Sequence, residues 1–416
     1  MELKIKIYPI EVIIIGLLIH SIGEFIFFSS KPLGYTICGF SIIITLIAGI
    51  IQIRPHTIPF KGLIRLLFQL YIIWILIILL RPLIFSSLIP LRSGFSPISS
   101  YLGLSYLIPF ITFLGLPNLS LKSILKFSIF YGLIGIVLVL INYHTIFSIP
   151  PIWDFDKYQM HLVLISFPLT FLLSGSCLIL FFFIIKSSYK ILAFLCIFLS
   201  ILIPLIAGRR GAVIMIIILI FFSIYLYIFQ VKRGSKILKI LLILLAISAA
   251  GTIFYVYSDS AFSLFLSRME EGTNSRAGIE KYFFDSFKDK PWDWLIGRGI
   301  NGTYHSPYIE MQNRNVIETG YLQLILSGGV INLFFFLFFL TYSAILGFFR
   351  SNNVLCKAMS FYLLYHIIYL YPYGLPSFSL EYLIVWIFIL YCNSREWREK
   401  SDDEIKLAIF AKNVIE

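Results

Sequence analysis

Three ionisable residues of this chain stand where an apolar segment begins or where a polar segment becomes helical. Glu318 opens an apolar run that continues through Gly329. Arg210 directly precedes another apolar run, and Arg276 begins a short amphipathic pattern. A carboxylate at the mouth of an apolar helix suits a general base, because partial burial raises its pKa towards neutrality. Guanidinium groups offer forked N–H donors that match phosphate oxygens. The sequence therefore predicts Glu318 as the base and Arg210 and Arg276 as anion-binding cations.

Each of these residues also has a purely structural interpretation. Arg209 and Arg210 can extend along apolar surface to the membrane interface; otherwise Arg209 helps to bind the substrate. Arg276 can be a solvated charge. A cation in the first turn of a helix opposes the helix dipole by about 0.3–1 kcal/mol, however, and a bound anion beside the free N–H groups relieves that penalty. Glu318 can pair with Arg314, which precedes it closely in the chain.

The polar segment 259–317 supplies the remaining candidates. Arg298 stands in Gly297-Arg298-Gly299-Ile300-Asn301-Gly302, which lacks the strand and βαβ unit of a nucleotide-binding loop, so we predict a tight turn there. His305 and Arg314 are, with Arg298, candidate substrate-binding residues, although a single loop histidine is also typical of a plain surface. No second His, Asp or Cys lies at metal-ligand spacing, so the sequence predicts neither a metal nor a cofactor.

The elements that must position these residues are membrane-spanning helices. The chain has 416 residues, of which 59% are hydrophobic and 13% charged, whereas soluble proteins carry about 25% charged residues. A span needs about 20 mainly apolar residues. We therefore predict an all-α integral membrane protein with about twelve transmembrane helices and one large loop. The predicted spans are 9–28, 33–53, 66–85, 100–117, 127–147, 161–185, 190–207, 212–230, 240–258, 318–347, 358–371 and 376–392.

These spans divide the chain into four parts. Residues 1–258 hold helices one to nine, 259–317 the large loop with short amphipathic helices, 318–392 helices ten to twelve, and 393–416 a tail. Basic residues recur in alternate loops, which places both termini in the cytoplasm and the large loop on the outer side. The net charge of +12 then faces anionic lipid headgroups, and no nucleic-acid partner is predicted. Arg81 and Arg92 depart from this rule, because they face outward.

The order of three motifs resembles the superfamily of bacterial O-antigen polymerases (Wzy-type) and O-antigen ligases. The motifs are Ala-Gly-Arg-Arg-Gly-Ala at 207–212, the stretch from Ser275-Arg276 to Leu-Ile-Gly-Arg-Gly at 295–299, and Glu318 through Gly328. The resemblance implies a metal-independent glycosyltransferase at the periplasmic face of the bacterial inner membrane. Its donor would be an oligosaccharide on undecaprenyl pyrophosphate, held by Arg210 and Arg276, with Glu318 as base or acceptor-orienting group.

Ligases of this superfamily typically show a histidine, nine further residues and a glycine at the start of the helix after the loop. Here Glu318 takes the histidine position in register with Gly328, which favours a polymerase of O-antigen or capsule, with a chain-length regulator and a flippase as partners. A ligase that transfers the glycan to lipid A core is the alternative within the same chemistry. A flippase or carrier of lipid-linked oligosaccharides is the alternative of another class, although the mid-span stretches Ile72–Leu80 and Val213–Phe222 are almost purely apolar.

Overall fold

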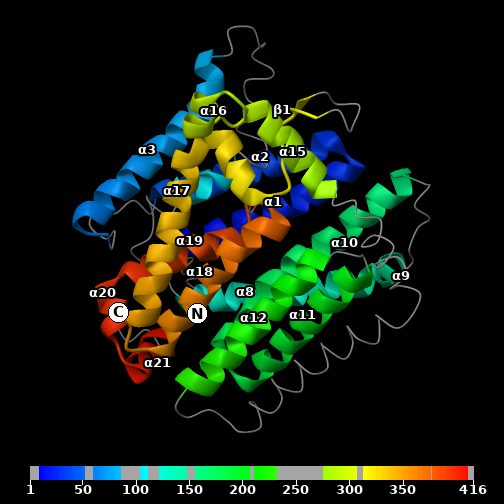
Figure 1. Cartoon of the computed structure of the whole chain (residues 1–416). Coiled ribbons are helices and arrows are strands. Elements are labelled where there is room, and N and C mark those ends of the chain that lie inside the picture. Colours follow the sequence, from blue (N-terminus) through cyan, green and yellow to red (C-terminus); the bar gives the residue numbers. More distant parts are fainter. Residues whose placement is uncertain are drawn as a thin grey trace.

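The computed structural model describes residues 9–51, 60–85, 104–110, 121–147, 155–206, 210–231, 275–306, 313–375 and 377–410. Among them, nine helices are long and apolar enough to cross a membrane. They are α1 (Pro9–Ser29), α2 (Lys31–Ile51), α3 (Gly62–Phe85), α8 (Leu121–Ile141), α10 (Phe155–Ser176) with its continuation η1 (Cys177–Phe181), α11 (Ser187–Ile206), α12 (Arg210–Tyr225) with η2 (Leu226–Gln230), α17 (Gly320–Phe349) and α18 (Val354–Tyr373). The described chain is thus an all-α, multi-pass membrane protein (Figure 1).

Each of these nine helices overlaps a span that the apolar runs predict. The predicted spans at 100–117 and 240–258 fall largely or wholly outside the described residues, where only 104–110 of the first is seen. A count of twelve therefore stays a prediction. Large apolar side chains point outward from several of the nine helices, with Phe40, Ile73 and Phe221 all more than half exposed. Such surfaces match lipid rather than water.

The helix over the predicted last span, 376–392, lies in the core of the helix bundle, and its status as a span stays a prediction. Helix α19 (Leu380–Asn393) has 14 residues, and every one is buried. At about 1.5 Å per residue it is about 21 Å long, short of the roughly 30 Å of hydrocarbon. Its Trp386 packs 5.8 Å from the Tyr71 ring of α3 and 6.2 Å from the Phe336 ring of α17. A helix that is apolar on all sides packs best when other helices surround it.

Helix α17 is broken near its start, although the sequence predicts one uninterrupted span. Gly329 has φ 71° and ψ −174°, which separates a short first segment from the long remainder. A side chain at Gly329 would collide with the Leu295 carbonyl group of the loop helix α16 (Pro291–Ile296), so the close approach requires glycine. The break leaves backbone carbonyl groups without their helical partners, and in a membrane protein these need other donors.

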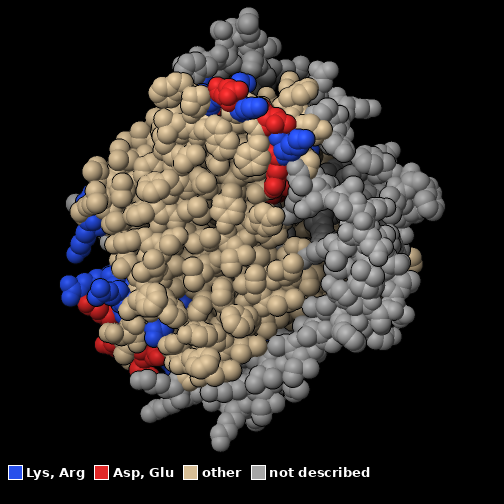
Figure 2. Space-filling view, in the orientation of Figure 1, with Lys and Arg blue, Asp and Glu red and all other residues tan. Residues whose placement is uncertain are grey.

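Charged residues gather at two opposite ends of the face shown in Figure 2, with an uncharged band between them. One end holds the loop helices α15 (Ser275–Phe287) and α16, and the other holds α20 (Arg395–Glu399) and α21 (Asp402–Phe410). The described parts of the large loop and of the C-terminal segment therefore lie at opposite ends of the transmembrane helices.

Candidate functional site

The loop helix α15 forms the amphipathic helix that the spacing of Ile279, Phe283 and Phe287 predicts. Phe283 and Phe287 are fully buried and pack on Tyr304 and on the first residues of α17, and Ile279 packs against the same cluster. The Phe283 ring lies 5.9 Å from the Tyr304 ring. The loop is thus folded onto the start of α17 by its own apolar side chains.

Polar contacts fasten the start of α17 to the same loop. The Thr319 hydroxyl, at the N-cap of α17, donates to Oε1 of Glu280 in α15. Gln323 accepts a 2.8 Å hydrogen bond from the Ile317 backbone and donates to the Asn315 carbonyl oxygen at 3.3 Å. Both Thr319 and Gln323 are buried. Glu318 precedes this cap, so its backbone position is fixed while its side chain is exposed.

The start of α12 and the start of α17 meet at the end of α18. A Cβ atom added to Gly211 would lie 2.7 Å from Cβ of Pro372. A Cβ atom on Gly374, just after α18, would lie 2.9 Å from the Glu318 carbonyl oxygen. Arg210 is the first residue of α12. The backbones of Arg210 and Glu318 therefore border one short segment, residues 372–374.

Arg276 lies on the helix that holds Thr319. It precedes Glu280 by four residues in α15, about one helical turn, and Glu280 binds the residue next to Glu318. The loop thereby brings the third predicted catalytic residue to the same end of the protein. The side chains of Arg210 and Arg276 lie outside the described part of the structure, and so does the whole of Arg209.

Glu318 and Arg314 both lie close enough to the Tyr304 phenol to change its pKa. Strands β1 (Tyr304–His305) and β2 (Asn313–Arg314) are antiparallel and pair Tyr304 with Arg314. Burial raises the pKa of Tyr304, while the Arg314 guanidinium lowers it and the Glu318 carboxylate raises it further, so both charges act on this phenol. No ion pair of the described residues joins Arg314 to Glu318. The structural pairing of these two side chains is therefore absent here.

The expected partial burial of Glu318 is wrong, because its side chain is exposed. The short apolar run suggested a carboxylate inside a helix entrance, but the polypeptide turns into α17 only after Thr319. In this structure Glu318 faces the loop side. A bound substrate would have to remove water from this carboxylate.

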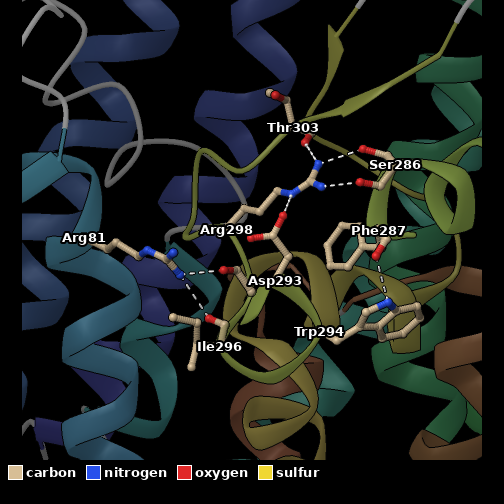
Figure 3. Close-up of polar contacts among 9 residues, drawn as sticks. Arg81, Ser286, Phe287, Asp293, Trp294, Ile296, Arg298 and Thr303 are labelled. Carbon is tan, nitrogen blue, oxygen red and sulfur yellow. Dashed lines mark hydrogen bonds and ion pairs between the residues drawn. The ribbon is translucent and has the colours of Figure 1, made fainter. Parts of the chain in front are cut away.

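Among the described cations of the loop, Arg298 has the most hydrogen bonds (Figure 3). Its Nε donates to Asp293 at 2.8 Å, Nη1 donates to the Ser286 hydroxyl and the Thr303 carbonyl oxygen, and Nη2 donates to the Ser286 carbonyl oxygen. The guanidinium carbon also lies 4.3 Å from the centre of the Phe287 ring. Four of its five N–H groups are thus engaged. Arg298 holds the loop together, and its predicted role in substrate binding stays untested.

The tight turn predicted at Gly297–Gly302 is confirmed, and it caps the broken helix. Gly297 and Gly299 have φ values of 68° and 83°. The backbone N–H groups of Arg298 and Gly299 donate to the carbonyl oxygens of Leu326 and Ser327, at 2.7 and 2.9 Å. The turn therefore supplies donors to carbonyl groups that the break at Gly329 releases.

Helix α3 contributes two residues that the sequence did not mark as part of this region. Trp74 Nε1 donates to the Gly328 carbonyl oxygen at 3.0 Å. Arg81 Nη1 donates to the carbonyl oxygens of Ile296 and Gly297, at 3.1 and 2.5 Å (Figure 3). Arg81 lies on the predicted outer side, although basic residues are expected on the cytoplasmic side. This departure was the one feature of the sequence that could have marked Arg81 as part of the region. The partners of Arg81 explain that position.

His305 is exposed on the opposite side of the hairpin from Tyr304, and nothing in the structure gives it a role. No group of three or more His, Cys, Asp or Glu residues in the described part of the chain could hold a metal ion. No protein-family model, curated protein or solved structure matches this chain. Any functional assignment therefore depends on the geometry of the end of the protein that holds α15, α16 and the start of α17, called the loop end below.

Proposed function

We propose that this protein is a membrane glycosyltransferase that polymerises lipid-linked repeat units of a bacterial surface polysaccharide. One observation carries the proposal: the starts of α12 and α17 meet at residues 372–374, and the Glu280–Thr319 contact ties α15 to them. This arrangement gathers Arg210, Arg276 and Glu318 from three separate elements at the loop end. Two cations and a carboxylate at a membrane surface are what this reaction needs.

The reaction itself joins two lipid-linked glycans. The acceptor hydroxyl attacks the anomeric carbon of the donor glycan, a new C–O bond forms, and the bond to undecaprenyl pyrophosphate breaks. Arg210 and Arg276 hold the pyrophosphate and stabilise the negative charge that develops on it. Glu318 accepts the proton of the hydroxyl, or orients that hydroxyl. Because Glu318 is exposed in the substrate-free chain, the bound glycans must exclude water before it acts as a base.

The orientation follows from the same proposal. The loop end faces the periplasm, where lipid-linked glycans are polymerised, and the C-terminal helices α20 and α21 face the cytoplasm. Basic residues near the C-terminal end, including Arg350, Lys357 and Lys406, agree with the rule that short cytoplasmic segments are basic. The membrane is the bacterial inner membrane, and the expected partners are a chain-length regulator and a flippase.

A buried contact between a histidine and a carboxyl group favours a second candidate function, that of a lipid-linked oligosaccharide carrier. His366 Nε2 of α18 lies 3.7 Å from Glu381 Oε1 of α19, and both residues are buried in the transmembrane region. Both His366 ring nitrogens lack a hydrogen-bond partner among the described residues. Ionisable residues inside membrane proteins often mark proton or substrate pathways. The ligase, by contrast, shares the chemistry and the site of the polymerase.

Deletion of the gene and electrophoresis of the surface polysaccharide distinguish these candidates. A polymerase mutant should carry a single repeat unit on its lipid A core. A ligase mutant should show bare core while polymer accumulates on undecaprenyl pyrophosphate. A flippase mutant should show no repeat unit on the surface. An unchanged polymer ladder would contradict all three assignments.

A further inference from the structure

Arg314 differs from Arg81 and Arg298, because its guanidinium lacks any hydrogen-bond or ion-pair partner among the described residues. Its Nη1 atom is buried as well as unpartnered. Arg81 and Arg298, by comparison, donate to several acceptors each. A buried N–H group without an acceptor loses its water and gains nothing in return. Arg314 is therefore poised for an acceptor that the described residues do not supply.

A second buried donor lies on the same side of the hairpin. Ser306 is fully buried, and its hydroxyl has no partner in the described part of the protein. Alternate residues of a strand share a face, so Ser306 follows Tyr304 onto one side, and Arg314 is the cross-strand neighbour of Tyr304. His305 and Asn313 take the opposite, exposed side. One face of the hairpin thus carries two donors without acceptors.

The two donors define the ligand that fits. A guanidinium and a hydroxyl group together match a carboxylate or a phosphate group, since the guanidinium only donates and its fork fits two oxygens of either anion. The hairpin lies with α15 and α16 at the loop end (Figure 1). If the loop end faces the periplasm, as proposed above, a ligand there comes from the aqueous side, where the sugars of a lipid-linked glycan extend.

We propose that Arg314 and Ser306 bind an acidic sugar of the repeat unit, so that the polymer made by this protein is anionic. The inference rests on the proposed polymerase function and specifies its substrate class. Arg314 would orient the glycan beside Glu318, because both charged groups act on the phenol of Tyr304. Arg210 and Arg276 remain assigned to the pyrophosphate.

The composition of the polysaccharide tests this directly. Polymer released from the parent strain should bind an anion-exchange column at neutral pH, and sugar analysis should find a uronic acid or a phosphate substituent. A neutral polymer that still depends on the gene would overturn the inference and leave the proposed function standing. A polymer that persists without the gene would instead overturn the proposed function.

Binding to the purified full-length protein in detergent tests the residues, with sodium glucuronate and inorganic phosphate as probes. Arg314→Ala should weaken binding of the preferred probe about tenfold to a hundredfold, the effect of losing a charge-assisted hydrogen bond. Ser306→Ala should weaken it less. Lys288→Ala, which removes an exposed cation from the same end, should leave it unchanged. Preference for glucuronate identifies a sugar carboxylate and preference for phosphate a phosphate substituent. Equal affinities of the parent and Arg314→Ala for both probes would overturn the inference.

Discussion

The two ends of this protein are built differently, and the difference lies in how many partners their polar side chains have within the described residues. At the C-terminal end, the buried Asn353 accepts from the Cys356 backbone and donates to the carbonyl oxygens of Trp397 and Lys400. Asp402 accepts from the Val354 backbone. At the loop end, Arg298 is equally well coordinated, but Arg314 lacks acceptors among the described residues and Glu318 is exposed. The contacts at the C-terminal end hold helices together, although Arg398 Nε is also buried without an acceptor. At the loop end, no described residue accepts from the guanidinium of Arg314.

The largest expected effect concerns the sidedness of these ends. A cysteine in place of Lys288, exposed after α15, should react with a membrane-impermeant thiol reagent in cells whose outer membrane is permeable. A cysteine in place of Lys406, exposed in α21, should react only after the inner membrane is opened. The unsubstituted chain, whose five cysteines are buried or half-buried, is the control. If both cysteines react while the inner membrane is closed, the two ends do not lie on opposite sides of the membrane.

Glu318→Gln should nearly stop chain extension. The amide keeps the shape of the side chain but cannot take the acceptor proton, and general-base assistance is worth about a hundredfold to ten-thousandfold. The polymer should stop at the single-repeat stage while the protein stays in the membrane, which gel electrophoresis and immunoblotting measure together. Glu318→His, which restores the ligase-like histidine, should retain partial activity. Normal polymer in Glu318→Gln would exclude Glu318 from the mechanism.

Arg210→Ala and Arg276→Ala should each lower the rate about a hundredfold to a thousandfold, the usual cost of losing a donor that stabilises developing charge. Replacement by lysine should restore little, because an ammonium group lacks the planar fork. Lys281→Ala, which removes an exposed cation of α15, is the matched control. Polymer of near-normal length in either alanine variant would show that the replaced arginine has only a structural role.

Arg298→Ala and Arg314→Ala should differ in stability, which sharpens the contrast inside the loop. Loss of Arg298 removes several hydrogen bonds from a charged group, each worth about 1.5–3 kcal/mol, so the thermal unfolding midpoint in detergent should fall. Loss of Arg314 removes an unpartnered buried N–H group and should leave the midpoint equal or higher. Equal destabilisation by both changes would show that Arg314 has a structural partner after all.

The smallest effect is expected at the Glu280–Thr319 contact. Glu280→Ala removes the acceptor and should cost about 1 kcal/mol, with shorter polymer because α15 and the start of α17 separate. Glu280→Gln keeps a carbonyl oxygen that accepts from Thr319 and should restore polymer length. Asp285→Ala, at an exposed position of the same helix, is the control. If polymer is as short in Glu280→Gln as in Glu280→Ala, the effect comes from the loss of negative charge rather than from the loss of the hydrogen bond to Thr319.

Local patterns of the sequence predict much of this fold. Apolar runs of about 20 residues mark the nine described spans, and the spacing of Phe283 and Phe287 marks α15, because both signals depend on neighbours along the chain. The burial of α19 was not predictable in this way, since a lipid-facing helix and a core helix are both apolar. The break at Gly329 depends on the Leu295 carbonyl group, which only the folded loop brings there.

The candidate site was predictable in its residue types but not in their availability. Glu318, Arg298 and Arg314 are all charged residues near apolar segments, and the sequence treats them alike. Arg298 and Arg314 differ because Ser286 and Thr303 surround Arg298 in the folded protein, whereas no described residue accepts from the Arg314 guanidinium. The roles of Trp74 and Arg81 were hidden for the same reason, because their acceptors lie more than 200 residues away in the chain.

That separation has a consequence for how the protein is made. Trp74 and Gly328 are 254 positions apart, and Arg81 and Ile296 are 215 apart. At about 5–20 residues per second, synthesis delivers the acceptor of Trp74 roughly 13–50 s after Trp74 itself. Until residues 296–328 are synthesised, the indole N–H of Trp74 and the guanidinium of Arg81 lack the acceptors that they have in the folded protein. We expect lipid headgroups or the insertion machinery to bind these groups during that time.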